Sequence, residues 1–355
     1  MVRTEEQWGL EASAYVDPAV FEAEQDVIFA RTWHLVGHVS QVGEHGKVLA
    51  ATIGRDPILI VNDRGTIRGL FNVCRHRGHE LVPPGETQRK SLTCPYHAWT
   101  YDLEGRLLTA RGERVGELCL PPVRVETAAG FLFATVDDDL PSLDDTIGPV
   151  GEEILVLAPD AAERVLTSRR THEFRANWKI AVENYNECYH CPNVHKAFTR
   201  GVIDPTTFRI TPTDVTIRHT ARGVRAERSG YERSPDADGY GAWYTWPLSS
   251  IQCYPGRVLN TFRWVPLAVD RTLLIREWWL DRSEPTAEQQ TIIDLDWDTT
   301  VAEDFGIMES VQRGVASRGY TPGPLIVDAS GTADVHAENA VAHLRDLFRA
   351  AVASP

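Results

Sequence analysis

The sequence predicts a two-domain α+β protein, and three observations support this fold class. The chain has 355 residues, which is long enough for two domains, and 43% of them are hydrophobic, a usual share for a protein with a buried core. Short β-prone runs fill much of the first half and return later, mixed with helical stretches. This order favours antiparallel sheets with helices placed around them over strict β-α alternation.

The charge and composition disfavour several classes of partner. The formal net charge is -14, which argues against nucleic acid because the phosphate backbone attracts clustered Lys and Arg. The N-terminal stretch lacks the apolar core of a signal peptide, and no apolar run approaches the roughly 18 residues of a membrane helix. We therefore expect a cytoplasmic protein without membrane partners. The six cysteines are too few and too unevenly spaced for a disulfide framework, so we expect thiols, ligands or core residues.

The N-terminal segment, residues 1–37, is expected to be helical and to pack on the second domain. Within residues 15–37 the apolar side chains of Val20, Ala23, Val27 and Ala30 recur at steps of three and four, with acidic residues between them. This spacing predicts an amphipathic helix that leads into the first domain.

Residues 38–150 are expected to form a small antiparallel β-domain. Turn sequences such as NDRG and LEGR separate its β-prone runs, which are 47–53, 57–62, 66–72 and 131–136. The acidic and turn-rich stretch 137–149 is the expected linker to the second domain.

Residues 151–355 are expected to form a second domain with its own antiparallel sheet. Strand-like runs occur at 214–224, 256–267 and 271–280. Helical patterns lie near 177–190, 286–318 and 333–352. Because the strands and helices do not alternate regularly, an α+β arrangement is expected here too.

Two loops at the ends of β-prone runs carry matching pairs of cysteine and histidine. They read Cys74-x-His76 and Cys94-x-x-His97, with 17 residues between His76 and Cys94. A structural zinc site is one interpretation, although zinc fingers and ribbons usually pair like with like. A [2Fe-2S] cluster with two thiolates on one iron and two imidazoles on the other suits the mixed loops better. Such a cluster can pass electrons to an oxygen-activating site.

A second set of candidate metal ligands lies in residues 177–195. Glu183, Glu187 and His190 follow one another at steps of four and three, so a helix would place a carboxylate one turn before a histidine. Pro192 disfavours continuation of that helix. The break allows His195 to approach His190, and the pair can bind one metal ion.

Asp304 is the candidate third ligand. It lies within an apolar helical stripe formed by Trp297, Val301, Met308, Val311 and Val315. A buried acid is costly unless it is paired or bound to a metal, whereas the neighbouring Glu303 and Glu309 lie off the stripe and can be solvated. His190, His195 and Asp304 therefore make a plausible two-His-one-carboxylate triad, which leaves open positions on Fe(II) for O₂.

The motifs resemble those of one enzyme family. The stretch CRHRGHELV, followed by CPYHAWTYDLEGRL, closely resembles the Rieske domain of the ring-hydroxylating, non-heme iron oxygenases. NWK…EN…YH…H and the later ED…E..QRG resemble the α subunits of the same family, so the likeness spans roughly residues 15–318. It implies an N-terminal antiparallel β Rieske [2Fe-2S] domain and a C-terminal helix-grip-like catalytic domain with an antiparallel sheet. It also implies two ligand sets: Cys74, His76, Cys94 and His97 for the cluster, and His190, His195 and Asp304 for the mononuclear Fe(II).

The resemblance further implies an assembly. Subunits of this family pack head to tail, as a homotrimer or a multiple of it, so that the cluster of one subunit lies beside the iron of the next. A carboxylate joins a cluster histidine to an iron histidine. By motif position this residue is Glu187, where most relatives have Asp. With glutamate at this position, the sequence resembles the branch of the family that acts on quaternary ammonium compounds such as betaines and carnitine.

The electrons must come from outside the chain. Oxidation of a C–H bond with O₂ as co-substrate requires two electrons, and the sequence has neither a GxGxxG opening a βαβ unit nor a plant-type cluster motif. The resemblance therefore implies a separate flavin and iron-sulfur reductase, with or without a ferredoxin, that uses NAD(P)H.

Aromatic residues in 240–264 are candidates for the substrate pocket, with Trp243, Trp246, Tyr254 and Trp264 foremost. They can enclose a trimethylammonium group or stack on an aromatic ring, and they can equally be ordinary core. The expected function is a Rieske monooxygenase or dioxygenase that hydroxylates or N-demethylates a small amine such as a betaine. Ring hydroxylation or O-demethylation of a small aromatic acid is the alternative. An electron-transfer protein without oxygenase activity is the alternative from another class.

Overall fold

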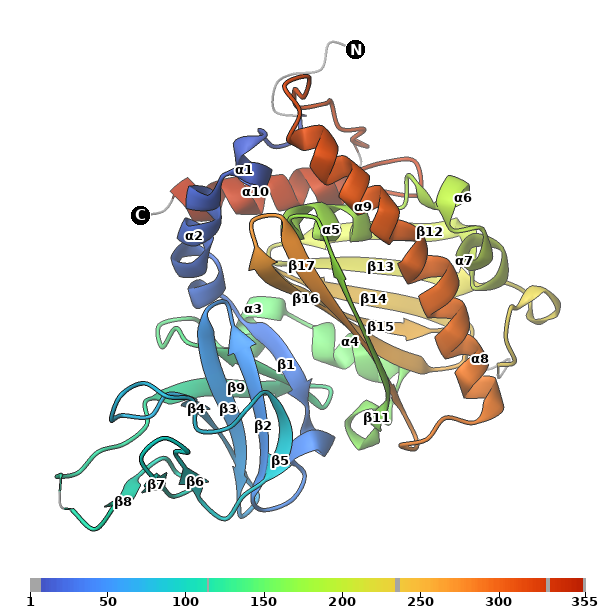
Figure 1. Cartoon of the computed structure of the whole chain (residues 1–355). Helices are drawn as coiled ribbons and strands as arrows, with labels where there is room; N and C mark the ends of the chain where they lie inside the picture. The colour runs from blue at the N-terminus through green and yellow to red at the C-terminus, as the bar shows by residue number, and fades with distance from the viewer. Residues whose placement is uncertain (1–7, 114, 234–236, 330–332, 354–355) are drawn as a thin grey trace. The chain divides into compact units, whose positions relative to one another are not determined.

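The computed structural model describes residues 8–113, 115–233, 237–329 and 333–353 (Figure 1). Contacts divide the chain into two compact units, one of residues Phe29–Gly148 and one that combines Met1–Ile28 with Pro149–Pro355. Both units are built on antiparallel sheets, and helices accompany them, as the α+β class requires. Within the described ranges, no helix has both the length and the apolar composition that a bilayer crossing needs.

The Phe29–Gly148 unit contains two antiparallel sheets. In spatial order the larger sheet consists of β1 His34–His38, β10 Phe131–Thr135, β9 Pro122–Ala128, β4 Thr66–Phe71, β3 Asp56–Asp63, β2 Lys47–Ile53 and β5 Gly85–Gln88. The smaller sheet consists of β6 Leu92–Thr93, β7 Trp99–Tyr101 and β8 Leu107–Ala110. The 3-10 turn η3 (Val39–Val42) follows β1, and the helix α3 (Leu143–Ile147) precedes the end of the unit.

The strand β3 shows why the larger sheet is covered on both faces. Its residues Ile58–Val61 are fully buried, so that alternate side chains point into two different apolar clusters. Leu59 and Val61 pack in the cluster that also holds Cys74 and Cys94. The face of β3 that carries Leu59 and Val61 thereby supports the two loops with the Cys/His pairs.

The N-terminal segment differs from the single helix predicted over 15–37. The structure has α1 Ser13–Val16, α2 Pro18–Val27 and a 3-10 turn at Phe29–Arg31, followed by the strand β1. Pro18 starts α2 because its fixed backbone angle suits the first helical turn, and Asp17 caps that turn by accepting from the N–H of Ala19. All five residues of β1 are buried, which an amphipathic helix with one exposed face cannot achieve.

The second unit is built on a seven-stranded antiparallel sheet. In spatial order its strands are β11 Val165–Phe174, β17 Arg271–Leu280, β16 Val258–Ala268, β15 Ser249–Tyr254, β14 Gly239–Thr245, β13 Thr216–Gly223 and β12 Ile203–Thr213. Its main helices are α4 Val150–Leu157, α5 Trp178–Tyr185, α6 Cys191–Val194, α7 Lys196–Gly201, α8 Ala287–Asp296, α9 Ala302–Val315 and α10 Asn339–Ala353. Short 3-10 turns lie at Ala161–Glu163 and Ala226–Arg228. Figure 1 shows α8 and α9 running across one face of this sheet.

Three helices differ in extent from their predicted ranges. The helix predicted over 177–190 is α5 and ends at Tyr185. The predicted helix 286–318 consists of α8, a π-helical turn at Trp297–Val301, and α9. The last predicted helix, 333–352, corresponds to α10 and starts later, at Asn339.

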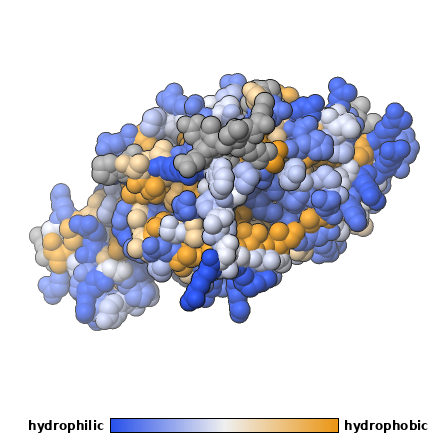
Figure 2. All heavy atoms as spheres, turned by 90° about the horizontal axis from the view of Figure 1, so that it is seen from above, coloured by the Kyte–Doolittle hydropathy of each residue, from blue (hydrophilic) through white to orange (hydrophobic). Residues whose placement is uncertain are grey.

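One residue of α9 departs from the predicted stripe. Val311, expected on the buried face, is 43% exposed, whereas Val301, Met308 and Val315 are buried. On the face seen from above Figure 1, hydrophobic side chains reach the surface among hydrophilic ones (Figure 2). Because single apolar side chains are common on protein surfaces, an exposed valine on α9 is ordinary.

Candidate metal centres

The two Cys/His loops have the same backbone hydrogen bonds. In each loop the cysteine carbonyl accepts from the N–H four residues later, and the cysteine N–H donates to the carbonyl five residues later, at 2.8 to 3.0 Å. The fifth residue of each loop, Gly78 in one and Ala98 in the other, has a positive φ, of 74° and 58° respectively. Two loops of equal geometry can therefore present equivalent ligand pairs.

The four predicted cluster ligands differ in how deeply they are buried. Cys74 and Cys94 are free thiols with 2% exposure each, while the rings of His76 and His97 lie outside that core with their centroids 4.6 Å apart. Two buried thiols and two outward imidazoles on paired loops are the donor set of a Rieske [2Fe-2S] cluster, so the residues present fit that group.

Tyr101 is a further residue at these loops, and the sequence analysis did not single it out. Its hydroxyl lies 3.4 Å from the Sγ of Cys74 and accepts a hydrogen bond of 3.0 Å from the N–H of Arg75. Burial raises the pKa of Tyr101, so its phenol keeps its proton and can donate to sulfur. Its place on β7, a few residues after Cys94, was the available signal.

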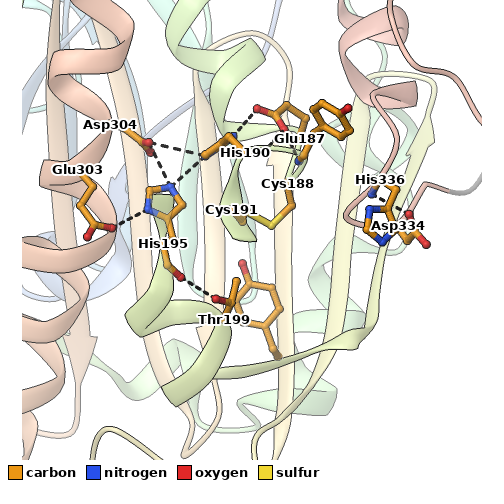
Figure 3. The surroundings of a disulfide bond; sticks show 12 residues. Glu187, Cys188, His190, Cys191, His195, Thr199, Glu303, Asp304, Asp334 and His336 are labelled. Atoms are coloured by element: carbon orange, nitrogen blue, oxygen red, sulfur yellow. Dashed lines mark hydrogen bonds and ion pairs between the residues drawn. A yellow bond between two sulfur atoms is a disulfide. The ribbon is translucent and has the colours of Figure 1, made fainter. Parts of the chain in front are cut away.

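His190, His195 and Asp304 converge in the second unit (Figure 3). The Nε2 atoms of His190 and His195 are 3.0 Å apart, and Asp304 Oδ1 lies 3.1 Å from the second and 3.7 Å from the first. One ligand atom from each residue lies within 4.8 Å of the others. The structure thus brings together the three residues that the sequence predicts as a triad.

The backbone reaches this geometry by a different route from the one predicted. The chain leaves the helix α5 at Tyr185, so Glu187 and His190 lie on a loop instead of a continuous helix face. Pro192 does not mark the end of a helix; it lies in the first turn of the short helix α6, and His195 follows directly after it. Proline is favoured at such a position because its missing N–H needs no partner there. Asp304 comes from the first turn of α9.

A carboxylate contacts the Nδ1 atom of each histidine. Glu187 Oε1 contacts His190 Nδ1, and Glu303 Oε2 lies 2.9 Å from His195 Nδ1. Carboxylates in this position fix the ring so that Nε2 faces the metal. Glu303 is exposed and Glu309 partly buried, as residues off the apolar stripe can be, and Glu309 also accepts a hydrogen bond of 3.0 Å from the N–H of Arg175. Periodicity placed both acids off the apolar stripe but could not show these contacts.

The acid of the triad has no hydrogen bond of its own. Asp304 Oδ1 is buried without a partner of suitable geometry, which is costly unless a cation satisfies it. Burial lowers the pKa of His195, but the carboxylates of Asp304 and Glu303 outweigh that effect and raise it above its ordinary value. A facial set of two imidazoles and one carboxylate with an unsatisfied oxygen fits Fe(II).

A disulfide closes the loop that carries His190. Cys188 and Cys191 are bonded, and both are buried next to the triad (Figure 3). The expectation that all cysteines are thiols, ligands or core residues is therefore wrong for these two. Six unevenly spaced cysteines disfavour a disulfide framework but do not exclude a single local bridge, and the four described cysteines outside this pair are free.

A cavity opens in front of the triad. Its wall includes Tyr254 and Trp264, two of the four predicted pocket residues. The other two are not among the residues lining it, which corrects the prediction. Trp243 is on the opposite face of β14 and donates from Nε1 to Glu153 of α4 at 2.7 Å, and Trp246 packs edge to face on Trp178. Strand alternation explains Trp243, because Tyr240, three residues earlier in β14, lines the cavity and the two side chains therefore lie on opposite faces.

A second cleft reaches the triad from another side. Both Glu187 and His190 line this cleft as well as the cavity. Its wall also includes Glu183, whose carboxylate accepts hydrogen bonds of 2.9 and 3.0 Å from the hydroxyl of Tyr15. The contact between Glu187 and His190 is therefore accessible from outside the cavity.

Two protein families match the chain. Residues 32–120 match the Rieske [2Fe-2S] domain, and residues 162–354 match the ring hydroxylating alpha subunit (catalytic domain). The first contains all four predicted cluster ligands and the second all three triad residues. The matched regions fall one on each of the two structural units.

Similar proteins share nearly the whole length of the chain. The carnitine monooxygenase oxygenase subunit of Escherichia coli K12 is 32% identical over 353 residues, covering 97% of this chain and 94% of the relative. The glycine betaine monooxygenase oxygenase subunit of Chromohalobacter salexigens is 32% identical, covering 87% and 80%. A solved quaternary ammonium Rieske monooxygenase with its substrate L-carnitine superimposes with a TM-score of 0.86 at 27% identity, covering 98% and 97%.

Proposed function

Because the chain belongs to the ring-hydroxylating α subunits that carry a Rieske [2Fe-2S] domain, we propose that it is an oxygenase component acting on a quaternary ammonium compound. It is a Rieske non-heme iron oxygenase, and its electrons come from a partner reductase. The observation that carries the substrate class is the aromatic wall of the cavity in front of His190, His195 and Asp304. Aromatic faces attract a trimethylammonium group. The relatives named for carnitine and glycine betaine support the same class.

We assign the two metal groups to the residues that fit them. Cys74, His76, Cys94 and His97 hold the cluster, and His190, His195 and Asp304 hold the mononuclear iron. When bound, the cluster supplies electrons one at a time and the Fe(II) provides the site where O₂ is activated.

The surrounding carboxylates orient the histidines. Glu187 fixes the ring of His190 from the cleft side, and Glu303 fixes the ring of His195. Since Glu187 also lines the second cleft, its carboxylate can reach a group that docks there. We assign it the bridging role toward the cluster of a neighbouring subunit.

The cavity wall binds and shields the substrate. Tyr185, Phe262 and Trp264 lie within 4.9 to 5.3 Å of one another, centroid to centroid, and form an apolar surface beside the triad. Such a surface excludes water and places the N-methyl or adjacent C–H groups toward the open side of the triad.

The assembly is proposed to be a homotrimer or a multiple of it, with electron transfer between subunits. A solved quaternary ammonium Rieske monooxygenase, 27% identical with a TM-score of 0.87, is described as showing inter-subunit electron transfer. We place the enzyme in the cytoplasm, where NAD(P)H supplies the reductase.

The proposal is tested with anaerobically purified enzyme. Iron and acid-labile sulfide are measured first, and about three irons with two sulfides per chain are expected. O₂ uptake and product formation are then followed with a reductase, NADH and a panel of quaternary amines and small aromatic acids. Substrate-dependent turnover of the amines alone supports the proposal. Turnover restricted to the aromatic acids contradicts it.

A further inference from the structure

The cavity wall carries no cationic side chain among the described residues that line it. Its formal charges come from Glu187 and Asp304, which are both acidic. His219 also lines the cavity, but burial lowers its pKa to about 3, so its ring is neutral at neutral pH. A divalent iron at the triad balances the two carboxylates and leaves no net positive charge on the wall.

The remaining wall is aromatic or neutral. Tyr240, Tyr254 and Phe198 extend the aromatic surface beyond Tyr185, and burial raises the pKa of all three tyrosines, which therefore stay uncharged. An amine cation is attracted by such a surface. A carboxylate is not, because the negative faces of the rings repel it.

The amide side chain on the sheet wall is also neutral. Gln252 donates from Nε2 to the hydroxyl of Tyr185 at 2.7 Å and accepts at Oε1 from Arg276 Nη2 at 2.9 Å. It can offer a hydrogen bond to an alcohol or amide but cannot balance a full negative charge.

The guanidinium nearest to this wall is already neutralised. Arg276 has no exposed surface and pairs with Asp296 through Nε at 2.9 Å and Nη2 at 2.7 Å. The ring of Phe262 lies 3.7 Å from its Cζ atom, between the guanidinium and the cavity that Phe262 lines. Arg276 therefore orients Gln252 and Phe262, and its charge is paired with Asp296, while its buried Nη1 has no hydrogen-bond partner.

We propose that the substrate is an amine cation whose other functional group is uncharged, such as an alcohol, ester or amide, and not a betaine with a free carboxylate. A carboxylate buried against a wall without a lysine or arginine side chain to pair with it is costly. This inference rests on the proposed function and separates the chain in specificity from relatives named for carnitine and glycine betaine. It also disfavours aromatic acids.

The test uses matched ligands on the iron-loaded enzyme under anaerobic conditions. γ-Butyrobetaine is compared with its amide, which has the same trimethylammonium group and chain, and binding is measured by calorimetry. The amide is expected to bind at least about tenfold more tightly, as one unpaired buried charge can easily account for such a ratio. Equal or tighter binding of the carboxylate overturns the inference. Binding of neither compound, with iron in place, instead overturns the proposed quaternary ammonium function.

A variant that adds a positive charge to the cavity wall provides a second measurement. Thr300 lines the cavity and is only partly buried, so Thr300→Lys adds a cation to the wall without burying it fully. We expect this variant to bind γ-butyrobetaine at least as tightly as the amide. Thr299→Lys is the matched control, because the neighbouring Thr299 is also partly buried but is not among the residues lining the cavity. The Thr299→Lys enzyme should therefore still bind the amide more tightly than γ-butyrobetaine. An unchanged preference in a folded, iron-loaded Thr300→Lys variant argues against charge as the determinant.

Discussion

At the scale of single residues, the triad shows how one unsatisfied atom identifies a ligand. His190 and His195 each have a carboxylate on Nδ1, so their Nε2 atoms are turned toward one another. Asp304 contributes an oxygen that is buried and lacks a hydrogen bond. Two Nε2 atoms 3.0 Å apart and a buried carboxylate oxygen without a hydrogen-bond partner form a set that a cation among them would satisfy.

Replacing Asp304 tests its role as a ligand. Asp304→Ala is expected to lose the mononuclear iron and substrate turnover while the cluster remains, because two imidazoles alone bind Fe(II) weakly. Iron and sulfide content are measured together with the visible spectrum of the cluster. Glu303→Gln, which keeps an acceptor for His195, serves as the comparison and should retain most of the iron. A full complement of three irons in Asp304→Ala is incompatible with the triad.

Replacing Glu187 tests the proposed bridge. Glu187 Oε2 also accepts from the N–H of His190 at 3.2 Å, so Glu187→Gln keeps an acceptor for the loop and removes only the charge. Turnover is expected to fall roughly 10- to 100-fold with both metal groups loaded. A single turnover of pre-reduced enzyme should be much less affected, since it needs less electron transfer between subunits than repeated turnover does. Unchanged steady-state turnover contradicts the assignment.

Glu183 makes stability depend on pH. Burial raises the pKa of this carboxyl from 4.5 to about 7, although the hydroxyl of Tyr15 and the ammonium of Lys179 oppose the rise. Because the pKa of this acid is raised, the folded state binds more protons than the unfolded state. The free energy of unfolding therefore falls as the pH rises from about 4.5 to about 7. Glu183→Gln should therefore raise the free energy of unfolding at pH 8 by roughly 1 to 3 kcal/mol and much less at pH 5. Urea unfolding at both pH values measures this, and an equal change at both contradicts it.

At the scale of elements, the ligand residues of the segment from α5 to α6 were predictable, but the backbone conformation of that segment was not. The residue types and spacing of Glu187, His190 and His195 indicated ligands, and the structure brings the two histidines together. The end of α5 at Tyr185 was missed because the helical periodicity of the apolar side chains continues past it. The bond between Cys188 and Cys191 depends on a loop conformation that the sequence pattern does not encode.

The disulfide is expected to hold the His190 loop in its metal-binding shape. It closes a small ring around Tyr189 and His190 and so reduces the conformations open to the loop. The double variant Cys188→Ser, Cys191→Ser should release the mononuclear iron to a chelator up to about tenfold faster, with the cluster unaffected. Cys119→Ser, which removes an exposed free thiol, is the control. Equal iron release from both variants shows that the bridge does not support the site.

At the scale of the whole molecule, the antiparallel class of the sheets in both units was predictable because antiparallel strands leave short apolar runs between turn residues. The strand β1 was not, since no proline or glycine lies between Ala30, where the helical pattern ends, and His34, where the strand begins. The predicted cavity residues were likewise only partly predictable. Aromatic content indicated a pocket, but the strand face that separates Trp243 from Tyr254 depends on register.

Mixed assemblies test electron transfer between subunits. Cys94→Ser removes a cluster ligand and Asp304→Ala a triad ligand, so each variant alone should be inactive. If the cluster of one subunit serves the iron of the next, coexpression restores activity, because about a quarter of randomly formed junctions join an intact cluster to an intact iron site. No activity in isolated mixed assemblies that retain both metal groups contradicts the proposed head-to-tail arrangement.

The bridge between Cys188 and Cys191 also affects how the enzyme's reducing equivalents are counted. A disulfide accepts two electrons when it opens, whereas the cluster accepts a single one. A stoichiometric titration with a strong reductant can therefore consume more equivalents than the iron centres account for. Thiol quantification before and after the titration separates the two sinks. Storage buffers that contain dithiothreitol would change the starting point of such an experiment without altering the colour of the protein.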